Sequence, residues 1–218
     1  MSPWRRLDRI SAVSAWDGLG DAWLPLPDVS SSYPSPLPLP AVPQFRVRPA
    51  RPADAEATRT IYNHEVLSTT ATFDLVPRSL DDQQQWLAAR SGAFAAIVAA
   101  DVSEAGGEGE VVGFAALSPY RERAAYRTSV EDSVYVRRDR NGEGIGRLLL
   151  EALLDVAEQS GFHAVFARIE SSGEASRALH ARCGFDLVGI EREVGRKFNR
   201  WLDVALMECL LHQRPRGT

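Results

Sequence analysis

The order of apolar and polar positions along the chain predicts a mixed α/β domain. We expect strands where apolar residues alternate with polar ones or form short β-prone runs, and helices where apolar residues recur every three or four positions. The predicted strands are 45–48, 94–102, 111–117, 129–136, 163–169, 185–189 and 201–211, and the predicted helices are 52–66, 79–90, 146–160 and 174–182. The resulting order is β-α-α-β-β-β-α-β-α-β-β, which predicts an α/β fold of the α+β type, built on one central sheet.

Local signals mark several ends of these elements. Ser79 and Asp82 have the spacing of a capping box, which predicts a helix start. Gly161 and Gly184 follow predicted helices, where a glycine commonly ends the last turn. The stretch 103–110 is rich in Gly and Glu and predicts a hairpin loop between two apolar strands.

The first 44 residues differ from the rest of the chain. Seven of the 13 prolines lie between Pro25 and Pro43, interleaved with serines. Proline fixes φ and removes a backbone donor, so this stretch favours an extended, poorly packed tail. We therefore predict a Pro/Ser-rich, disordered and dispensable tail at 1–44, followed by one domain at 45–212. An arm that docks on a partner or a second subunit is the alternative.

Composition limits the possible partners. The chain is 44% hydrophobic and 25% charged, as is ordinary for a globular protein. A formal net charge of −4 disfavours nucleic acid, because a phosphate backbone selects a basic surface. No run approaches the roughly 20 apolar residues of a membrane-spanning helix. We expect a cytoplasmic protein that binds neither nucleic acid nor a membrane.

Cysteine and histidine usage predicts no disulfide framework and no metal. The cysteines, Cys183 and Cys209, lie in apolar stretches and are expected to be buried thiols. The histidines form no HxH or HExxH pair that would hold a metal. They are scattered at His64, His163, His180 and His212.

A glycine-rich turn is the most informative segment. Gly142, Gly144 and Gly146 alternate between the apolar strand that ends at Val136 and a strongly apolar helix. Glycines let consecutive N–H groups converge on one point, and a helix N-terminus adds partial positive charge. The turn therefore indicates a pyrophosphate site. A simple connecting turn is the alternative, and neither a Walker A loop nor a dinucleotide-binding GxGxxG fits the residues that surround it.

At these residues the chain resembles the GNAT acyltransferase superfamily, and within it the phosphinothricin and L-amino-acid N-acetyltransferase branch. The similarity covers about 45–211. It rests on the number and order of separate motifs at 61–65, 72–74, 120–127, 130–136, 142–147, 179–185 and 192–203. The resemblance implies a GNAT fold, with a mixed, mostly antiparallel sheet whose central strands splay apart and are flanked by helices.

The resemblance also implies a site for acetyl-CoA as co-substrate. The backbone of Val134, Tyr135 and Val136 would pair with the pantetheine arm as an added strand does, and an N–H there would polarise the thioester carbonyl. The remaining residues implied to contact the cofactor are Gly142, Glu143, Gly144, Ile145, Gly146, Arg147, Gly173 and Arg182.

The chain departs from the superfamily pattern at two positions. The loop usually has Arg or Gln where this chain has Asn141, with Arg140 one place early. The short helix is usually preceded by Asn, where this chain has Gly173. We expect weaker binding of CoA rather than its loss, because the main contacts come from the backbone.

Two residues are candidates for the chemistry. Glu131 lies among valines on the strand beside the expected thioester slot, and apolar surroundings raise a carboxyl pKa toward that of a working base. His180, on the short helix, is a candidate to protonate the departing thiolate. Tyr126 and Tyr135 are alternative acids. A surface carboxylate and a structural histidine are the plain alternatives.

Basic residues before the Glu131 strand suggest an anionic acceptor. Arginine binds carboxylates and phosphinates through forked donors. The predicted acceptor-binding residues are Phe73, Arg121, Arg123, Tyr126, Arg127 and Ser133, and Asn63 and the Lys197–Phe198 pair are candidates to complete the pocket. In this branch such segments can come from the second subunit of a homodimer.

The function that follows is transfer of acetyl to the α-amino group of a small amino-acid-like molecule, by direct attack on the thioester. Phosphinothricin, methionine sulfoximine, methionine sulfone or a related L-amino acid would fit. Three alternatives stay open: a protein N-terminus as acceptor, a polyamine as acceptor, and a sensor that binds acyl-CoA without turnover.

Overall fold

The computed structural model describes residues 44–102, 107 and 109–214 of the 218-residue chain. The predicted tail, apart from Gln44, and most of the predicted loop at 103–110 lie outside these residues. The elements occur in the predicted order: β1 (Phe45–Pro49), α1 (Ala55–Ser68), α2 (Leu80–Ala88), β2 (Ala96–Asp101), β3 (Glu110–Pro119), β4 (Ser129–Val136), α3 (Ile145–Gln159), β5 (Ala164–Glu170), α4 (Glu174–Arg182), β6 (Asp186–Lys197) and β7 (Arg200–Leu210).

The strands form one sheet in the order β1-β2-β3-β4-β5-β7-β6. Within the described residues β4 and β5 are the only parallel neighbours, and every other pair is antiparallel. The predicted mixed, mostly antiparallel sheet is therefore confirmed. Its parallel pair lies at the centre, which becomes important for the site.

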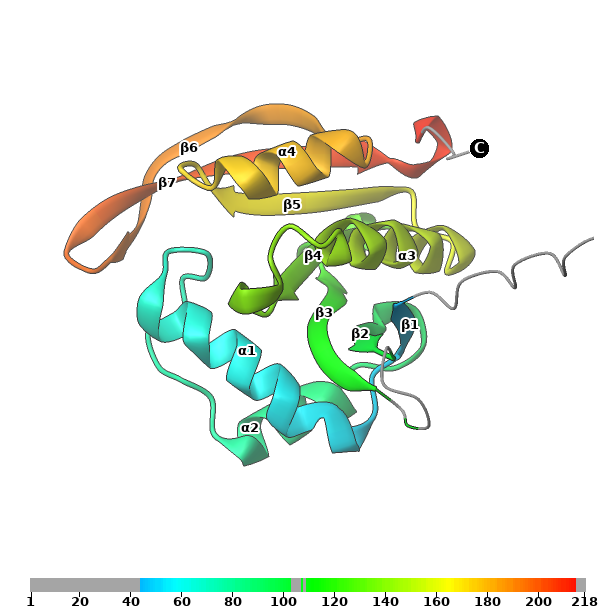
Figure 1. Cartoon of the computed structure of the whole chain (residues 1–218). Coiled ribbons are helices and arrows are strands. Elements are labelled where there is room, and N and C mark those ends of the chain that lie inside the picture. Colours follow the sequence, from blue (N-terminus) through cyan, green and yellow to red (C-terminus); the bar gives the residue numbers. More distant parts are fainter. Residues whose placement is uncertain (1–43, 103–106, 108, 215–218) are drawn as a thin grey trace, which may run out of the picture. The chain divides into compact units, whose positions relative to one another are not determined.

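Helices cover both faces of the sheet (Figure 1). The apolar stripe of α3, which includes Leu149 and Leu153, packs into the largest core cluster together with Val130 of β4. A second cluster joins Ile61 and Tyr62 of α1 to the opposite face of β3. An interior of this kind is close-packed, so both layers hold β4 firmly in place.

The predicted helix boundaries are largely confirmed. The Ser79 hydroxyl accepts a hydrogen bond from the Asp82 N–H at 3.1 Å, which completes the predicted capping box. Gly161 and Gly184 adopt φ of 80° and 91° after α3 and α4, a conformation that suits glycine.

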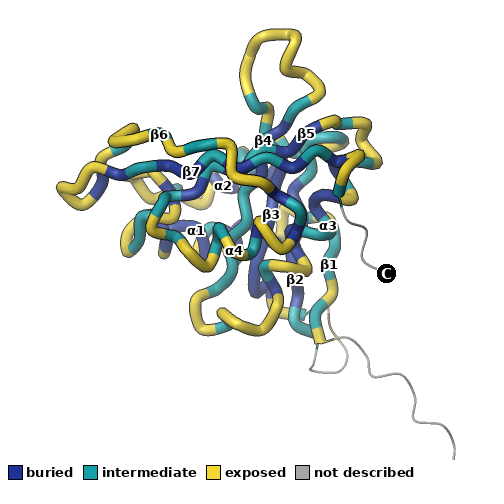
Figure 2. The backbone as a smooth tube through the Cα atoms, turned by 90° about the horizontal axis from the view of Figure 1, so that it is seen from above, coloured by how far each residue is buried: buried dark blue, intermediate teal, exposed yellow. Residues whose placement is uncertain are grey.

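The predicted end of β6 at residue 189 is wrong. The strand continues to Lys197 and forms a long hairpin with β7, drawn in orange in Figure 1. Register shifts between Leu187 and Gly189 and between Glu191 and Gly195 interrupt the alternation on which the prediction relied. Much of β6 is also exposed (Figure 2), so its sequence lacks a continuous apolar face.

Candidate active site

The central parallel strands separate soon after they meet. β4 pairs with β5 only through Ser129–Ala164, Val130–Val165 and Glu131–Phe166. Beyond Glu131, β4 remains paired with β3 as far as Val136, and β5 remains paired with β7 as far as Glu170. The predicted splay is therefore present. The edge of β4 from Asp132 to Val136 has no strand partner on its β5 side within the described residues.

The glycine turn connects this free edge to α3. Gly142 and Gly144 have φ of 88° and 82°, in the left-handed region. A Cβ added at either residue would meet no atom within 4 Å, so the backbone conformation requires glycine while the space beside the turn is open. A Cβ at Gly146 would come within 3.2 Å of Leu179 on α4. The turn thus presents backbone at the N-terminus of α3, and the side chain of Ile145 is buried.

Arginines around the turn are paired with carboxylates. Arg140 donates to Glu143 at 2.8 Å and to Asp101 at 2.7 Å, which braces the turn against the end of β2. Arg147 donates to Glu151 at 2.7 Å on the exposed side of α3. An anion bound at this turn would therefore be held mainly by backbone N–H groups and the helix N-terminus. That suits a chain with Asn141 at the position where the superfamily has a longer polar side chain.

Gly173 begins α4 in a crowded turn. A Cβ there would lie 3.0 Å from the carbonyl oxygen of Glu170. The Glu170 carboxylate accepts hydrogen bonds from the N–H of Ser172, at 3.0 Å, and from its hydroxyl. Glu170 therefore orders the turn that would lie beside the cofactor. Arg182 is exposed at the other end of α4.

Glu131 is half-buried at the point where the strands part. Burial raises the pKa of its carboxyl above the usual range, with further contributions from Asp132 and Glu191, while Arg168 and Arg121 oppose the shift. Its carboxylate makes no hydrogen bond to any residue that the structure describes. Within the described residues, Glu131 is thus a carboxyl group without a hydrogen-bond partner beside the free strand edge.

Asp132, the next residue, points to the other face of β4 and is buried with His180 of α4. Its Oδ2 lies 3.0 Å from Nε2 of His180, and Nδ1 of His180 lies 2.7 Å from the carbonyl oxygen of Ser176. Both ring nitrogens therefore face oxygen acceptors, as a protonated imidazole requires. Burial opposes the charge, but Asp132 outweighs it and the pKa of His180 is raised. Oδ1 of Asp132 is buried without a partner among the described residues.

Only some residues of the loop before β4 lie near Glu131. Tyr120 stacks on Phe166, the partner of Glu131, with ring centroids 4.1 Å apart, and Arg121 lies 5.0 Å from the Tyr120 ring. Tyr126 meets the edge of Tyr120 at 5.6 Å. These contacts bring Arg121 and Tyr126 to the face of the sheet that carries Glu131. Arg123 and Arg127, also predicted as acceptor-binding residues, are exposed, and no contact places them in the site.

The side chains of Tyr135 and Ser133, two of the predicted site residues, lie on the same face of β4 as Glu131. Tyr135 packs between Phe114 and Tyr62, and burial raises the pKa of its phenol far above the usual range. This packing makes its side chain a poor acid, and its backbone is what remains for the cofactor. Ser133 is half-buried, one alternation beyond Glu131 on the same face.

The β6–β7 hairpin is joined to the loop after α1. The Phe73 ring lies against Gly195, where an added Cβ would come within 2.2 Å of it. The buried Lys197 donates to the carbonyl oxygens of Thr72, at 2.8 Å, and Glu65, at 3.3 Å. The Phe73 side chain is itself partly exposed. Phe73 and Gly195 therefore form one packed surface, and the buried Lys197 fixes its position. The side-chain amide of Asn63 donates to the carbonyl oxygen of Arg78 and accepts from its N–H, so it holds the chain before α2 against α1.

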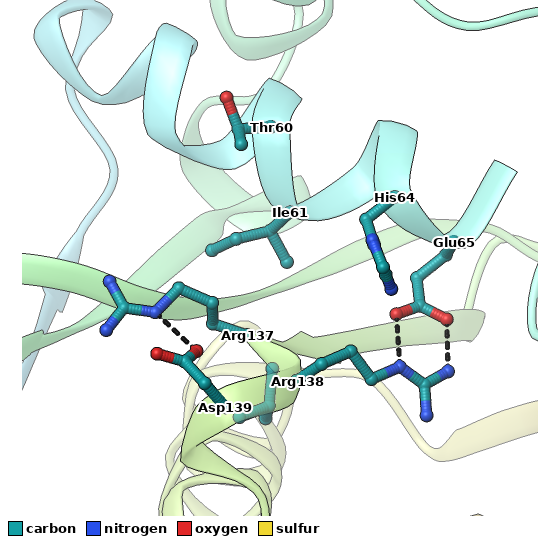
Figure 3. A pocket seen from close by; sticks show the side chains of 8 residues that line it. Thr60, Ile61, His64, Glu65, Arg137, Arg138 and Asp139 are labelled. Carbon is teal, nitrogen blue, oxygen red and sulfur yellow. Dashed lines mark hydrogen bonds and ion pairs between the residues drawn. The ribbon is translucent and has the colours of Figure 1, made fainter. Parts of the chain in front are cut away.

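A cavity of about 260 Å³ lies between α1 and the end of β4 (Figure 3). Two ion pairs, Glu65–Arg138 and Arg137–Asp139, lie on its wall. Burial of Glu65 opposes ionisation, but hydrogen bonds from Arg138 and Thr69 lower its pKa. Of the lining residues only Val136 was predicted as a site residue. The full lining is Thr60, Ile61, His64, Glu65, Val136, Arg137, Arg138 and Asp139.

Four residues of the site were not predicted: Asp132, Arg168, Glu191 and Glu170. Asp132 lies in one of the motifs, but its pairing with His180 spans 48 residues of sequence. Arg168 and Glu191 form an ion pair that becomes possible only because β7 brings β5 and β6 together in the order β5-β7-β6. Within the described residues no group of three or more metal-binding side chains occurs, and no helix is long and apolar enough to cross a membrane.

Comparison with known proteins places these features in a family. Residues 47–206 match the acetyltransferase (GNAT) domain family. The chain is 41% identical over 172 residues to the phosphinothricin N-acetyltransferase of Streptomyces coelicolor, an alignment that covers 78% of this chain and 98% of the relative. It is 41% identical over 167 residues to the L-methionine sulfoximine/L-methionine sulfone acetyltransferase of Pseudomonas aeruginosa, covering 76% and 94%.

A solved structure has the same fold with a ligand bound. The phosphinothricin acetyltransferase of Sinorhizobium meliloti, in complex with acetyl-CoA, aligns with a TM-score of 0.71 and 34% sequence identity. The alignment covers 77% of this chain and 88% of that protein.

Proposed function

The chain belongs to the GNAT acetyltransferase family, and on that basis we propose that it transfers acetyl from acetyl-CoA to the α-amino group of a small L-amino acid or analogue. Phosphinothricin, methionine sulfoximine and methionine sulfone, the acceptors named for its relatives, are the first candidates. One observation carries the proposal: Glu131 lies, uncommitted, where β4 and β5 part and leave a free strand edge.

The described residues fit acetyl-CoA. The free edge of Val134, Tyr135 and Val136 is able to pair with the amides of a pantetheine arm. The open turn from Gly142 to Arg147 offers backbone N–H groups to a pyrophosphate. Gly173 and Arg182 flank this space from α4. When bound, acetyl-CoA supplies a thioester whose acyl carbon an amine can attack.

Glu131 takes the proton that the amine must lose, directly or through a water. A base works best when its pKa lies near the operating pH, and burial moves the pKa of Glu131 in that direction. An N–H on the free edge of β4 would donate to the carbonyl oxygen of the acyl group as charge develops there.

His180 is held against Asp132, on the face of β4 opposite Glu131. Because both of its ring nitrogens are occupied, it could protonate a thiolate only after the ring has left Asp132 or Ser176. His180→Asn distinguishes the roles. Both roles predict a lower melting temperature, because the buried pair with Asp132 is broken. At a temperature where the variant is folded, an acid role predicts a loss of kcat and a supporting role predicts that kcat is largely retained.

The proposal also covers the oligomeric state of the enzyme, its compartment and its need for a metal. Large apolar side chains are exposed along the β6–β7 hairpin, including Leu187 at 55%, Val194 at 50% and Trp201 at 60%. Exposed large apolar side chains are typical of protein interfaces, and they support a homodimer formed through this hairpin, which sedimentation would test. We also propose a cytoplasmic enzyme that works without a metal, so that activity survives a chelator.

The deciding experiment follows thiol release from acetyl-CoA with a panel of acceptors. Turnover on L-methionine sulfone, methionine sulfoximine, phosphinothricin or a common L-amino acid supports the proposal. Turnover confined to N-terminal peptides or to spermidine would replace the acceptor. Binding of CoA without turnover on any amine would indicate a sensor and contradict the proposed activity.

A further inference from the structure

Arg168 lies where β4 and β5 separate, on the face of the sheet that carries Glu131. Glu131 pairs with Phe166, the last contact between β4 and β5, and Arg168 follows Phe166 by one alternation. Side chains two positions apart on a strand share a face. Arg168 is also the strongest of the positive charges that act on the Glu131 carboxylate.

The guanidinium is held in place by Glu191 of β6. Nη1 donates to Oε1 of Glu191 at 3.3 Å, and Nη2 donates to Oε2 in a short contact. The two side chains are 28% and 35% exposed, so the pair is partly sheltered. Arginine has five N–H donors, and within the described part of the chain only these two are used. The remaining donors are available to a ligand.

A base and a cation placed side by side match the two charged groups of an α-amino acid. Its ammonium and its carboxylate are attached to the same carbon, so a base for the first and a cation for the second must adjoin each other. Arg168 lies on the neighbouring strand, two residues beyond Phe166, the partner of Glu131, and its charge acts on the Glu131 carboxylate. Arg121, the other cation that acts on Glu131, is exposed on a loop and lies over the Tyr120 ring. A donor fixed by a strand and an ion pair is better preorganised than one on a loop.

Resting on the proposed function, we infer that Arg168 binds the acceptor's carboxylate and that Glu191 is a positioning residue that holds the guanidinium for this task. The acceptor class is therefore amines with a free carboxylate, or an equivalent anion, on the carbon that bears the nitrogen.

A purely structural ion pair is the competing explanation. β5 is paired with β7 from Ala164 to Glu170, and β6 is paired with β7 from Gly189 to Glu191, so backbone pairing already joins the three strands where the ion pair lies. Partly exposed ion pairs contribute little to stability. A structural role therefore predicts a small loss that is the same for every acceptor.

The test compares two acceptors that differ only in the carboxylate: L-methionine sulfone and its carboxamide. Turnover of the acid by the unmodified protein first establishes the proposed function, so a failure there is distinct from a failure of this inference. For Arg168→Ala we expect kcat/KM for the acid to fall about 10- to 100-fold, mainly through KM, the range for losing a hydrogen bond to a charged group. For the carboxamide we expect a change of at most about threefold.

Two further variants sharpen the result. Arg168→Lys keeps the charge but loses the fork, and Glu191→Gln keeps the arginine but loosens it, so each should give a smaller, acid-selective rise in KM. Arg59→Ala is the matched control. Arg59, on helix α1, likewise donates from two guanidinium nitrogens to one carboxylate, that of Glu56, at 2.9 and 2.6 Å. Equal losses of kcat/KM for acid and carboxamide in Arg168→Ala, or no loss with either, would overturn the inference.

Discussion

Glu131 and Asp132 are consecutive carboxylates on β4, yet the fold gives them opposite environments. Glu131 is half-buried on the face that carries Arg168 and has no hydrogen-bond partner among the described residues. Asp132 is buried on the other face, against His180. One residue of sequence, and therefore one alternation of the strand, separates a carboxylate without a hydrogen-bond partner among the described residues from a carboxylate held in an ion pair.

The difference shows that burial alone does not select a catalytic group. Both carboxylates are shielded from water, but only Asp132 has a partner that requires its charge. A buried ion pair contributes less to stability than its Coulomb energy suggests, whereas breaking it is costly because one charge is left alone. The two residues should therefore fail in different ways when changed.

The largest effect is expected for Glu131→Gln. The amide keeps the size of the side chain but cannot accept a proton, so kcat should fall about 10²- to 10⁴-fold. The melting temperature should stay within about 2 °C, since no hydrogen bond is lost. Steady-state kinetics on L-methionine sulfone and a thermal scan measure the two quantities. A drop in melting temperature that accompanies the loss would assign Glu131 a structural role.

Asp132→Asn should show the reverse pattern. Removing the charge leaves the buried imidazole without its partner, which costs about 3 kcal/mol in the free energy of unfolding. The rate at a temperature where the variant is folded should remain within about tenfold of the original. Denaturant unfolding gives the first quantity, and the assay gives the second. A folded Asp132→Asn with unchanged stability and no activity would reverse the assignment of the two carboxylates.

The pH dependence of this loss has a defined sign. Asp132 raises the pKa of His180 in the folded protein above its usual value. The stability that the pair contributes is then fully present below the unfolded pKa, roughly 6.5, and is lost as the pH rises through the folded pKa. The difference in unfolding free energy between the unmodified protein and Asp132→Asn should therefore shrink toward alkaline pH. A difference that grows with pH would show that His180 is neutral when buried.

Removing both partners should cost less than the single changes predict. In Asp132→Asn/His180→Gln neither charge remains, so the unfolding free energy should exceed the additive expectation by about 1 to 3 kcal/mol. A double-mutant cycle in denaturant measures this coupling. Strict additivity would mean that the 3.0 Å contact carries no energy.

The smallest effect sharpens the account of Glu131. Arg168 lowers the pKa of Glu131 and Glu191 raises it. Arg168→Ala should therefore move the acidic limb of kcat/KM to higher pH, and Glu191→Gln should move it to lower pH. The carboxamide acceptor is used here, so that carboxylate binding does not contribute. Shifts in the same direction would show that the limb belongs to another group.

The sequence predicted those parts of the site that rest on local signals. The turn with Gly142 and Gly144, and the place of Glu131 on the central strand, are encoded within a few residues and were supported by the family resemblance. The Arg168–Glu191 pair could not be predicted, because it depends on β7 lying between β5 and β6. Residues 190–197 were missed as strand, because register shifts and exposure remove the alternation on which such predictions depend.

The most direct test of the central claim is the pH profile of acetyl transfer by Glu131→Gln, measured in single turnovers with saturating acetyl-CoA. In the unmodified protein the rate should rise with pH as a group with a pKa above 4.5 loses its proton, since burial raises the pKa of Glu131 from that value. In Glu131→Gln this limb should disappear, leaving a low rate that follows only ionisation of the amine. A variant that retains both the limb and the rate would contradict the assignment of Glu131 as the base.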